Sequence, residues 1–120
     1  MKLAFEYLGL GALSFLAVII LEALAVGLGG HLLRTEMYSI HSFSHVFFGI
    51  GLASIMLFFR PRSSVRVVVL MVLFAGIAWE LFEGSWLRGE PIDSVEDVVL
   101  AVLSASTFLC FIRRDGEPDR

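Results

Sequence analysis

Cysteine is almost absent from this chain: Cys110 is the only one, so an internal disulfide is impossible. Basic residues are also few, because Lys and Arg together number 9 against 12 Asp and Glu, for a formal net charge of −3. The sequence contains no nucleophile elbow, no P-loop, no haem-attachment motif and no basic surface suited to nucleic acids. These absences exclude a disulfide-stabilised scaffold and argue against binding of nucleotides, DNA or RNA.

Long apolar runs dominate the chain, which is 58% hydrophobic with a mean hydropathy of +0.85. Each run is long enough to cross, as a helix, a hydrocarbon core of about 30 Å. An outer-membrane barrel is excluded, because barrel strands alternate apolar and polar residues, whereas these runs are apolar on every face. We therefore predict an all-α polytopic membrane protein, an antiparallel bundle of four transmembrane helices. The four runs are residues 7–29, 43–59, 65–82 and 95–112.

The chain divides into a single transmembrane domain, residues 1–112, and a charged tail, residues 113–120, which we expect to be disordered. Most basic residues fall on one side of the predicted bundle, and only Arg34 and Arg88 fall on the other. Because basic residues favour the cytoplasmic side, we predict a multi-pass protein of the cell membrane with both termini in the cytoplasm. The basic residues of that side are Lys2, Arg60, Arg62, Arg66, Arg113, Arg114 and Arg120.

The first apolar run has an alternative interpretation as a cleaved secretory signal. Lys2 precedes the run, and Ala23 and Ala25 have the spacing of a cleavage site. Glu22 and the length of the run favour a retained helix instead. Cleavage would leave the orientation of the other three helices unchanged.

Acidic residues and histidines recur at the predicted outer ends of the helices, in pairs three or four residues apart. The pairs are His41/His45, Glu80/Glu83 and Asp93/Asp97. This spacing puts the members of each pair on one face of a helix, so three helices can converge on one pocket. Carboxylates gathered at low dielectric need a proton, an arginine or a cation to neutralise them. We predict one outward-facing polar site, formed by His45, Glu80, Glu83, Asp93 and Asp97.

The same five residues, His45, Glu80, Glu83, Asp93 and Asp97, are candidates both for catalysis and for binding a divalent metal ion. Carboxylates with a histidine suit Mg²⁺, Mn²⁺, Fe²⁺ or Zn²⁺, and the sequence does not choose among them. A bound metal could polarise a phosphoryl or carbonyl oxygen and lower the pKa of a bound water, while a remaining carboxylate served as general base. Without a metal, the cluster could relay protons.

Several of these residues also have purely structural explanations. Asp93 is a good N-cap for the fourth helix, and His45 could form a hydrogen bond across the bundle. We expect His41 to be an interfacial residue. The role of Glu22 stays open, because it could look into the site, pair with Arg34 or be protonated. Small residues predict helix-packing surfaces at Gly27, Gly29 and Gly30, at Gly49 and Ala53, and at Ala75 and Gly76.

Three segments carry polar motifs: residues 44–49 have a His followed by a Gly four residues later, residues 78–83 have Glu-x-x-Glu, and residues 92–97 have Asp-x-x-x-Asp. In these motifs and their order the sequence resembles the VanZ-like superfamily, especially its YjdF-type branch. The resemblance covers residues 42–111, and Asp97 stands where VanZ itself has Asn. It implies a small membrane fold and, as site residues, the five named above, with Gly49 as a close-packing partner. It implies little about activity, since VanZ itself is associated with reduced susceptibility to a glycopeptide antibiotic.

Three functional hypotheses follow. The first is a metal-dependent membrane enzyme acting on a lipid-linked or cell-envelope substrate, with the lipid bilayer and a lipid-linked small molecule as partners. The second is a homo-oligomeric, proton-coupled transporter or channel subunit that uses intramembrane carboxylates. The third is a non-catalytic membrane helper subunit. A transporter site should lie near the midplane of the bilayer, so polar residues at one end of the helices favour a one-sided site.

Overall fold

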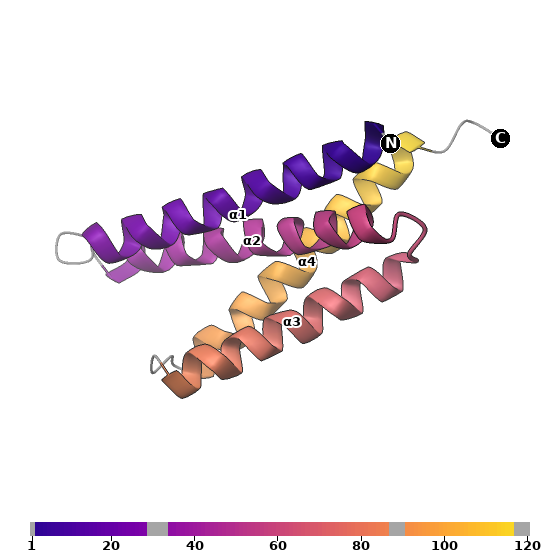
Figure 1. Ribbon diagram of the computed structural model, residues 1–120. Coiled ribbons are helices and arrows are strands. Elements are labelled where there is room, and N and C mark those ends of the chain that lie inside the picture. The colour runs from indigo at the N-terminus through magenta and orange to yellow at the C-terminus, as the bar shows by residue number, and fades with distance from the viewer. Residues whose placement is uncertain (1, 29–33, 87–90, 117–120) are drawn as a thin grey trace.

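The computed structural model describes residues 2–28, 34–86 and 91–116 and is all-α, with no strand among those residues. Each helix contains a segment long and apolar enough to cross a membrane, which confirms the predicted four-helix membrane architecture. These segments are Phe5–Gly27, Ile40–Phe59, Val65–Phe82 and Val95–Arg113. The helices themselves are α1 (Lys2–Leu28), α2 (Arg34–Phe59), α3 (Val65–Trp86) and α4 (Pro91–Gly116), as Figure 1 shows.

All four helices extend beyond the apolar runs that predicted them, and the extensions of α2 and α4 are the longest. α2 begins at Arg34, so the polar stretch that contains His41 is helical. α4 continues to Gly116, and Arg113, in its last turns, donates a hydrogen bond to the carbonyl oxygen of Ser63 at 2.8 Å. Hydropathy marks only the part of a helix that suits hydrocarbon, whereas the helical backbone can continue into the polar interface.

α2 is the central helix of the arrangement. It packs against α1 along much of its length and against α4, and α4 in turn packs against α3. In the part of the chain that the structure describes, α1 packs only on α2. The start of α1, the connection between α2 and α3, and the end of α4 share one end of the molecule (Figure 1). That end therefore carries Arg60, Arg62 and Arg113, as the predicted topology requires.

Small residues let α2 and α4 approach closely. A Cβ atom built on Gly49 would lie 2.1 Å from the carbonyl oxygen of Ala101, a distance that real Cβ atoms do not show. One turn further along each helix, Ala53 and Ala105 are completely buried. Rows of residues four apart form the ridges by which helices interlock, and small residues in such rows allow close backbone contact in membranes. The rows here are His45, Gly49, Ala53 and Leu57 on α2 and Asp97, Ala101, Ala105 and Leu109 on α4.

Other predicted packing surfaces have mixed outcomes. Gly49 and Ala53 are confirmed, and Gly76 packs on α4, since a Cβ there would lie 3.5 Å from a methyl carbon of Val98. The prediction is wrong for Gly27, which is exposed with nothing within 4 Å of an added Cβ. Gly27 is near the end of α1, where no other described helix covers that face. Gly29 and Gly30 lie outside the described residues.

The core of the bundle toward its basic end is apolar, and the outward faces of the helices are apolar as well. Leu57, Val68, Val72 and Leu109 are buried together on the side of the bundle toward the basic end. Many large apolar side chains are exposed, for example Phe5 and Phe74 at 65% and 64%. In water such a surface would drive aggregation, but in a bilayer it is the surface that contacts lipid.

Candidate metal centre

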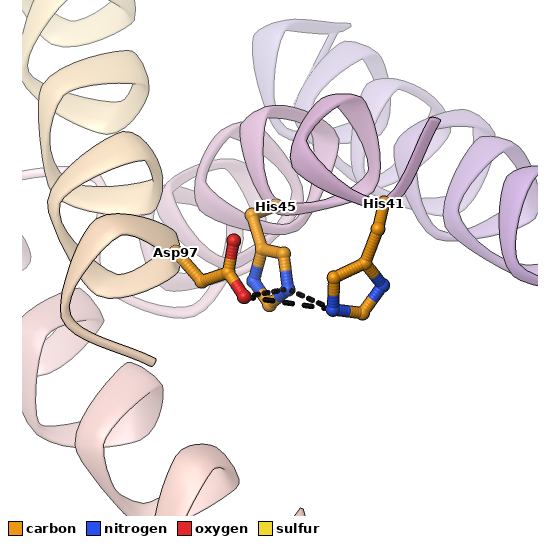
Figure 2. A group of neighbouring side chains, drawn as sticks. All are labelled: His41, His45 and Asp97. Carbon is orange, nitrogen blue, oxygen red and sulfur yellow. Dashed lines mark hydrogen bonds and ion pairs between the residues drawn. The ribbon is translucent and has the colours of Figure 1, made fainter. Parts of the chain in front are cut away.

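Three side chains from two helices converge at one point, as Figure 2 shows. His41 and His45 project from α2, and Asp97 reaches them from α4. The Oδ2 atom of Asp97 lies 3.2 Å from Nε2 of His45 and 3.5 Å from Nε2 of His41. The two Nε2 atoms are 3.4 Å apart. The three atoms therefore form a nearly equilateral triangle of potential ligands.

The sequence places these groups through helical geometry and one close helix contact. His41 and His45 are four residues apart, so their rings lie on the same face of α2, with ring centroids 4.8 Å apart. Asp97 comes from another helix and reaches them only because the backbones of α2 and α4 are close. Gly49 and Ala101, which make that contact, lie one turn beyond His45 and Asp97 respectively. The glycine therefore supports the geometry of the site.

Glu22 of α1 joins the cluster from the other side of His41. Its Oε1 atom lies 2.9 Å from Nδ1 of His41 and also accepts a hydrogen bond from the hydroxyl of Ser44. The same hydroxyl also lies 2.7 Å from the backbone carbonyl oxygen of His41, so its one proton is shared between these two acceptors. Side chains of α1, α2 and α4 thus meet in one polar cluster: Glu22, His41, Ser44, His45 and Asp97.

The contact with Glu22 determines which nitrogen of His41 is available. A carboxylate oxygen only accepts hydrogen bonds, so the proton between Glu22 and His41 belongs to Nδ1. In the neutral ring this leaves the lone pair of Nε2 directed at Asp97 and His45. Metal-binding histidines are typically held in this way, with a carboxylate on the outer nitrogen fixing tautomer and ring orientation.

Burial changes from one side of the cluster to the other. The side chains of His45 and Asp97 are only 7% and 5% exposed, whereas those of His41 and Glu22 are 31% and 39% exposed. A buried carboxylate that contacts two imidazoles needs protons or a cation between the contacting atoms. Among the described residues, every buried side-chain nitrogen or oxygen has a hydrogen-bond partner. The cluster therefore has one buried side, at His45 and Asp97, and one accessible side, at His41 and Glu22.

The spacing of the three ligand atoms suits a metal ion. His41, His45 and Asp97 could hold one. With metal–ligand bonds of about 2.0–2.1 Å and tetrahedral angles, neighbouring ligand atoms lie about 3.4 Å apart. The observed separations of 3.2, 3.4 and 3.5 Å are close to that value before any adjustment of the side chains. Two imidazoles and one carboxylate are also the ligand set of several catalytic zinc and iron sites.

The predicted site residues lie in different places. His45 and Asp97 come together in the cluster, whereas Glu80 lines a separate cavity between α3 and α4, together with Ile77 and Val98. The side chains of Glu83 and Asp93 lie outside the described part of the structure. Of the predicted set, only His45 and Asp97 are thus shown in contact.

Three members of the cluster were not assigned to the site from the sequence. His41 is predicted at the interface, yet it contacts Glu22, His45 and Asp97. Its four-residue spacing from His45 is the sequence feature that could have identified it. For Glu22, whose role the sequence does not decide, that feature is a carboxylate within an apolar run. No sequence feature identifies Ser44, since a serine in a membrane helix commonly bonds to its own backbone.

Comparisons of the whole chain with protein-family models, with curated proteins and with solved structures gave no match. The resemblance to the VanZ-like superfamily therefore stays a prediction from the three motifs.

Proposed function

We propose that this protein is a metal-dependent membrane enzyme whose centre consists of His41, His45 and Asp97. The observation that carries the proposal is the convergence of two Nε2 atoms and one Oδ2 atom within 3.5 Å of one another. Glu22 supports it, because its carboxylate holds Nδ1 of His41 and turns the other nitrogen toward the centre.

The ligand set narrows the choice of metal. Mg²⁺ and Ca²⁺ prefer oxygen ligands, whereas a site with two imidazoles and one carboxylate suits Zn²⁺ or Fe²⁺. Structural zinc sites have four protein ligands, while catalytic sites have three and keep one position open. The three protein ligands found here therefore favour catalysis over a structural metal.

Beside the centre lies a cavity, which gives a substrate access to it. Its volume is about 480 Å³, within the usual range of small-molecule sites, and its lining includes Glu22, His41, Ser44 and His45. A metal bound there would polarise a phosphoryl or carbonyl oxygen and supply an activated water, so we infer hydrolysis of a lipid-linked or cell-envelope ester. Glu22 would hold His41, and the Ser44 hydroxyl would fix the Glu22 carboxylate.

A proton-coupled transporter is the second candidate, and one observation favours it. Glu22, His41 and Asp97 form a continuous row of titratable groups from α1 to α4. Against it, the packed core toward the basic end is apolar and includes Leu57, Val72 and Leu109. Within the described residues the row of titratable groups does not continue through that core. This arrangement favours a site that is reached from one side.

The experiment is elemental analysis of the purified protein in mild detergent after supplementation with Zn²⁺ or Fe²⁺. We expect near-stoichiometric metal in the wild type and its loss in His45→Ala and Asp97→Asn. Glu80→Gln is the matched control, because it neutralises a carboxylate of the bundle that lines a different cavity. Circular dichroism and gel filtration would show that all variants are folded and equally oligomeric.

Two results would contradict the proposal. Absence of metal in the folded wild type after supplementation would favour the proton-coupled or helper alternatives. Loss of metal in Glu80→Gln, with His41→Ala unaffected, would instead favour the larger acidic site predicted from the sequence. A metal-loaded wild type would justify hydrolysis assays on alkyl phosphates and alkyl esters.

A further inference from the structure

The cavity beside the metal centre has a polar end and an apolar end. Glu22, His41, Ser44 and His45 line the first. Residues of three helices line the rest: Phe15, Val18 and Ile19 of α1, Phe48 of α2 and Trp79 of α3. From Glu22 to Phe15, and from His41 to Phe48, the helices run seven residues, or about 10 Å. The apolar part therefore extends about 10 Å along the bundle from the polar cluster.

Aromatic rings form the apolar end. The ring centroids of Phe15 and Phe48 are 6.0 Å apart in an edge-to-face arrangement, and those of Phe48 and Trp79 are 6.1 Å apart. These contacts connect α1 to α2 and α2 to α3. Such a row of rings gives the cavity a wall that no polar headgroup would favour and that a hydrocarbon chain would contact well.

The cavity has a lateral opening between α1 and α3. Its two outer walls belong to α1 and α3, and in the described structure these helices do not pack on each other. The wall residues Ile19 and Trp79 are 65% and 46% exposed. Both lie within the predicted membrane segments Phe5–Gly27 and Val65–Phe82, so the opening faces lipid. A ligand can therefore enter from the bilayer.

The polar end lies near the membrane surface. His41 is the second residue of the apolar segment Ile40–Phe59, and Asp97 is the third of Val95–Arg113. An amphiphile in the bilayer would thus have its headgroup at the level of the cluster and its chain at the level of Phe15 and Phe48. The depth of the polar cluster, the polarity of the cavity lining and the lateral opening therefore all favour this orientation of the ligand.

We propose that the cavity binds a membrane amphiphile by one alkyl chain, which lies along Phe15, Val18 and Phe48, with an anionic headgroup oxygen at the His41/His45/Asp97 metal. This inference rests on the proposed metal centre and names the substrate class and its route of entry. The charge is decisive for the headgroup. Glu22 and Asp97 would repel an anion in the absence of a metal, whereas a divalent cation with an open position attracts one.

The test uses Trp79 as a reporter in the full chain, reconstituted in phosphatidylcholine nanodiscs. Trp79 lines the cavity, and Trp86→Phe removes the other tryptophan of the sequence. The probe is dodecyl phosphate brominated on its chain, which quenches tryptophan fluorescence on contact. We expect saturable quenching with Zn²⁺ bound and its loss after chelation. Unbrominated dodecyl phosphate should compete with the probe, whereas inorganic phosphate should not. Brominated dodecyl trimethylammonium, used as a cationic probe, should give no saturable quenching.

A cavity-filling variant separates the two proposals. Val18→Phe puts a ring into the cavity from α1, whereas Leu13→Phe adds the same ring at an exposed position, 65% accessible, outside the lining. We expect Val18→Phe to keep its metal and to bind the probe at least about ten-fold more weakly. Leu13→Phe should resemble the wild type. Metal content is measured on every sample, so failure of the metal centre is recognised independently of probe binding.

Specific outcomes would overturn the amphiphile proposal. Equal probe binding by Val18→Phe and the wild type would show that the chain lies elsewhere while leaving the metal centre intact. Inorganic phosphate that competes as well as dodecyl phosphate would indicate a site for the free anion. Saturable quenching that survives chelation, or that the cationic probe reproduces, would exclude coordination of an anionic headgroup.

Discussion

Substitution of Gly49 by alanine should disable the metal centre without touching any of its ligands. The added Cβ atom would lie 2.1 Å from the carbonyl oxygen of Ala101 and 2.4 Å from Oγ of Ser104. The Ser104 hydroxyl can rotate away, but the Ala101 oxygen belongs to the backbone of α4. To reach an ordinary contact of about 3.4 Å, α2 and α4 must separate by roughly 1.3 Å at this level.

The separation acts on the site one turn away. If it reaches His45 and Asp97 undiminished, their Nε2 and Oδ2 atoms move from 3.2 Å to roughly 4.5 Å apart. Ligand atoms of one metal ion lie about 3.4 Å apart, so Asp97 would no longer share an ion with both histidines. Because displacements near 1 Å can cost about a hundred-fold in function, we expect metal affinity to fall by about that factor.

The assay is competition for Zn²⁺ against a chromophoric chelator in detergent, with thermal unfolding followed by circular dichroism. Overpacking should also destabilise the bundle by about 1–3 kcal/mol. Gly27→Ala and Gly76→Ala are the matched controls, since an added Cβ meets nothing within 4 Å at Gly27 and is at 3.5 Å from Val98 at Gly76. Both should bind metal normally, with a gain in helix stability of up to about 1 kcal/mol.

Folded Gly49→Ala that binds Zn²⁺ as tightly as the controls do would contradict this prediction. That result would mean that α2 and α4 separate without moving His45 from Asp97, or that the metal ligands lie elsewhere. A general loss of folding would be recognised by the helix content and by gel filtration. In that case titration of the remaining folded fraction with Zn²⁺ would provide the same comparison.

Three further predictions concern the ligands and the packing. Glu22→Gln should lower Zn²⁺ affinity about 10- to 100-fold in the same chelator competition, because the neutral amide orients His41 less well; unchanged affinity would exclude the supporting role of Glu22. Metal retained after dialysis should decrease from about pH 8 to pH 5, since both imidazoles and Asp97 must be deprotonated to bind; retention independent of pH would contradict histidine ligation. Ala53→Leu should lower the unfolding free energy by about 1–3 kcal/mol, because Ala53 is completely buried; the lipid-facing control Leu103→Ala, at a side chain 57% exposed, should have a smaller effect.

The direction of each helix is enough to predict which polar residues lie at the same level of the bundle. His45 and Asp97 were expected at the same end of two helices that run in the same direction, and the structure places them in contact. Glu80 is at that end too, yet it lines the cavity between α3 and α4. The level of a residue follows from its position along an apolar run, but the direction of its side chain depends on how each helix is rotated about its axis. Hydropathy carries little information on rotation when every face is apolar.

Glu22 is a second residue whose contacts depend on helix rotation. A carboxylate within an apolar run is expensive in hydrocarbon, so the sequence alone indicated that it needs a partner. Which partner it has depends on the face of α1 that packs against α2. The contacts of Glu22 with His41 and Ser44 follow from that packing, in which Gly11 and Gly51 bring the two helices close. The sequence predicts that Glu22 needs a partner, but it does not predict which residue that partner is.

The sequence by itself determined the class of the protein, the number of helices, and the side on which the basic residues gather. These properties follow from the length and hydropathy of four runs, because a backbone in hydrocarbon must satisfy its hydrogen bonds within a helix. The tertiary structure decided which polar side chains meet. His41, His45 and Asp97 form one centre because Gly49 has no side chain, so α4 can approach α2 closely enough for a carboxylate to reach two imidazoles.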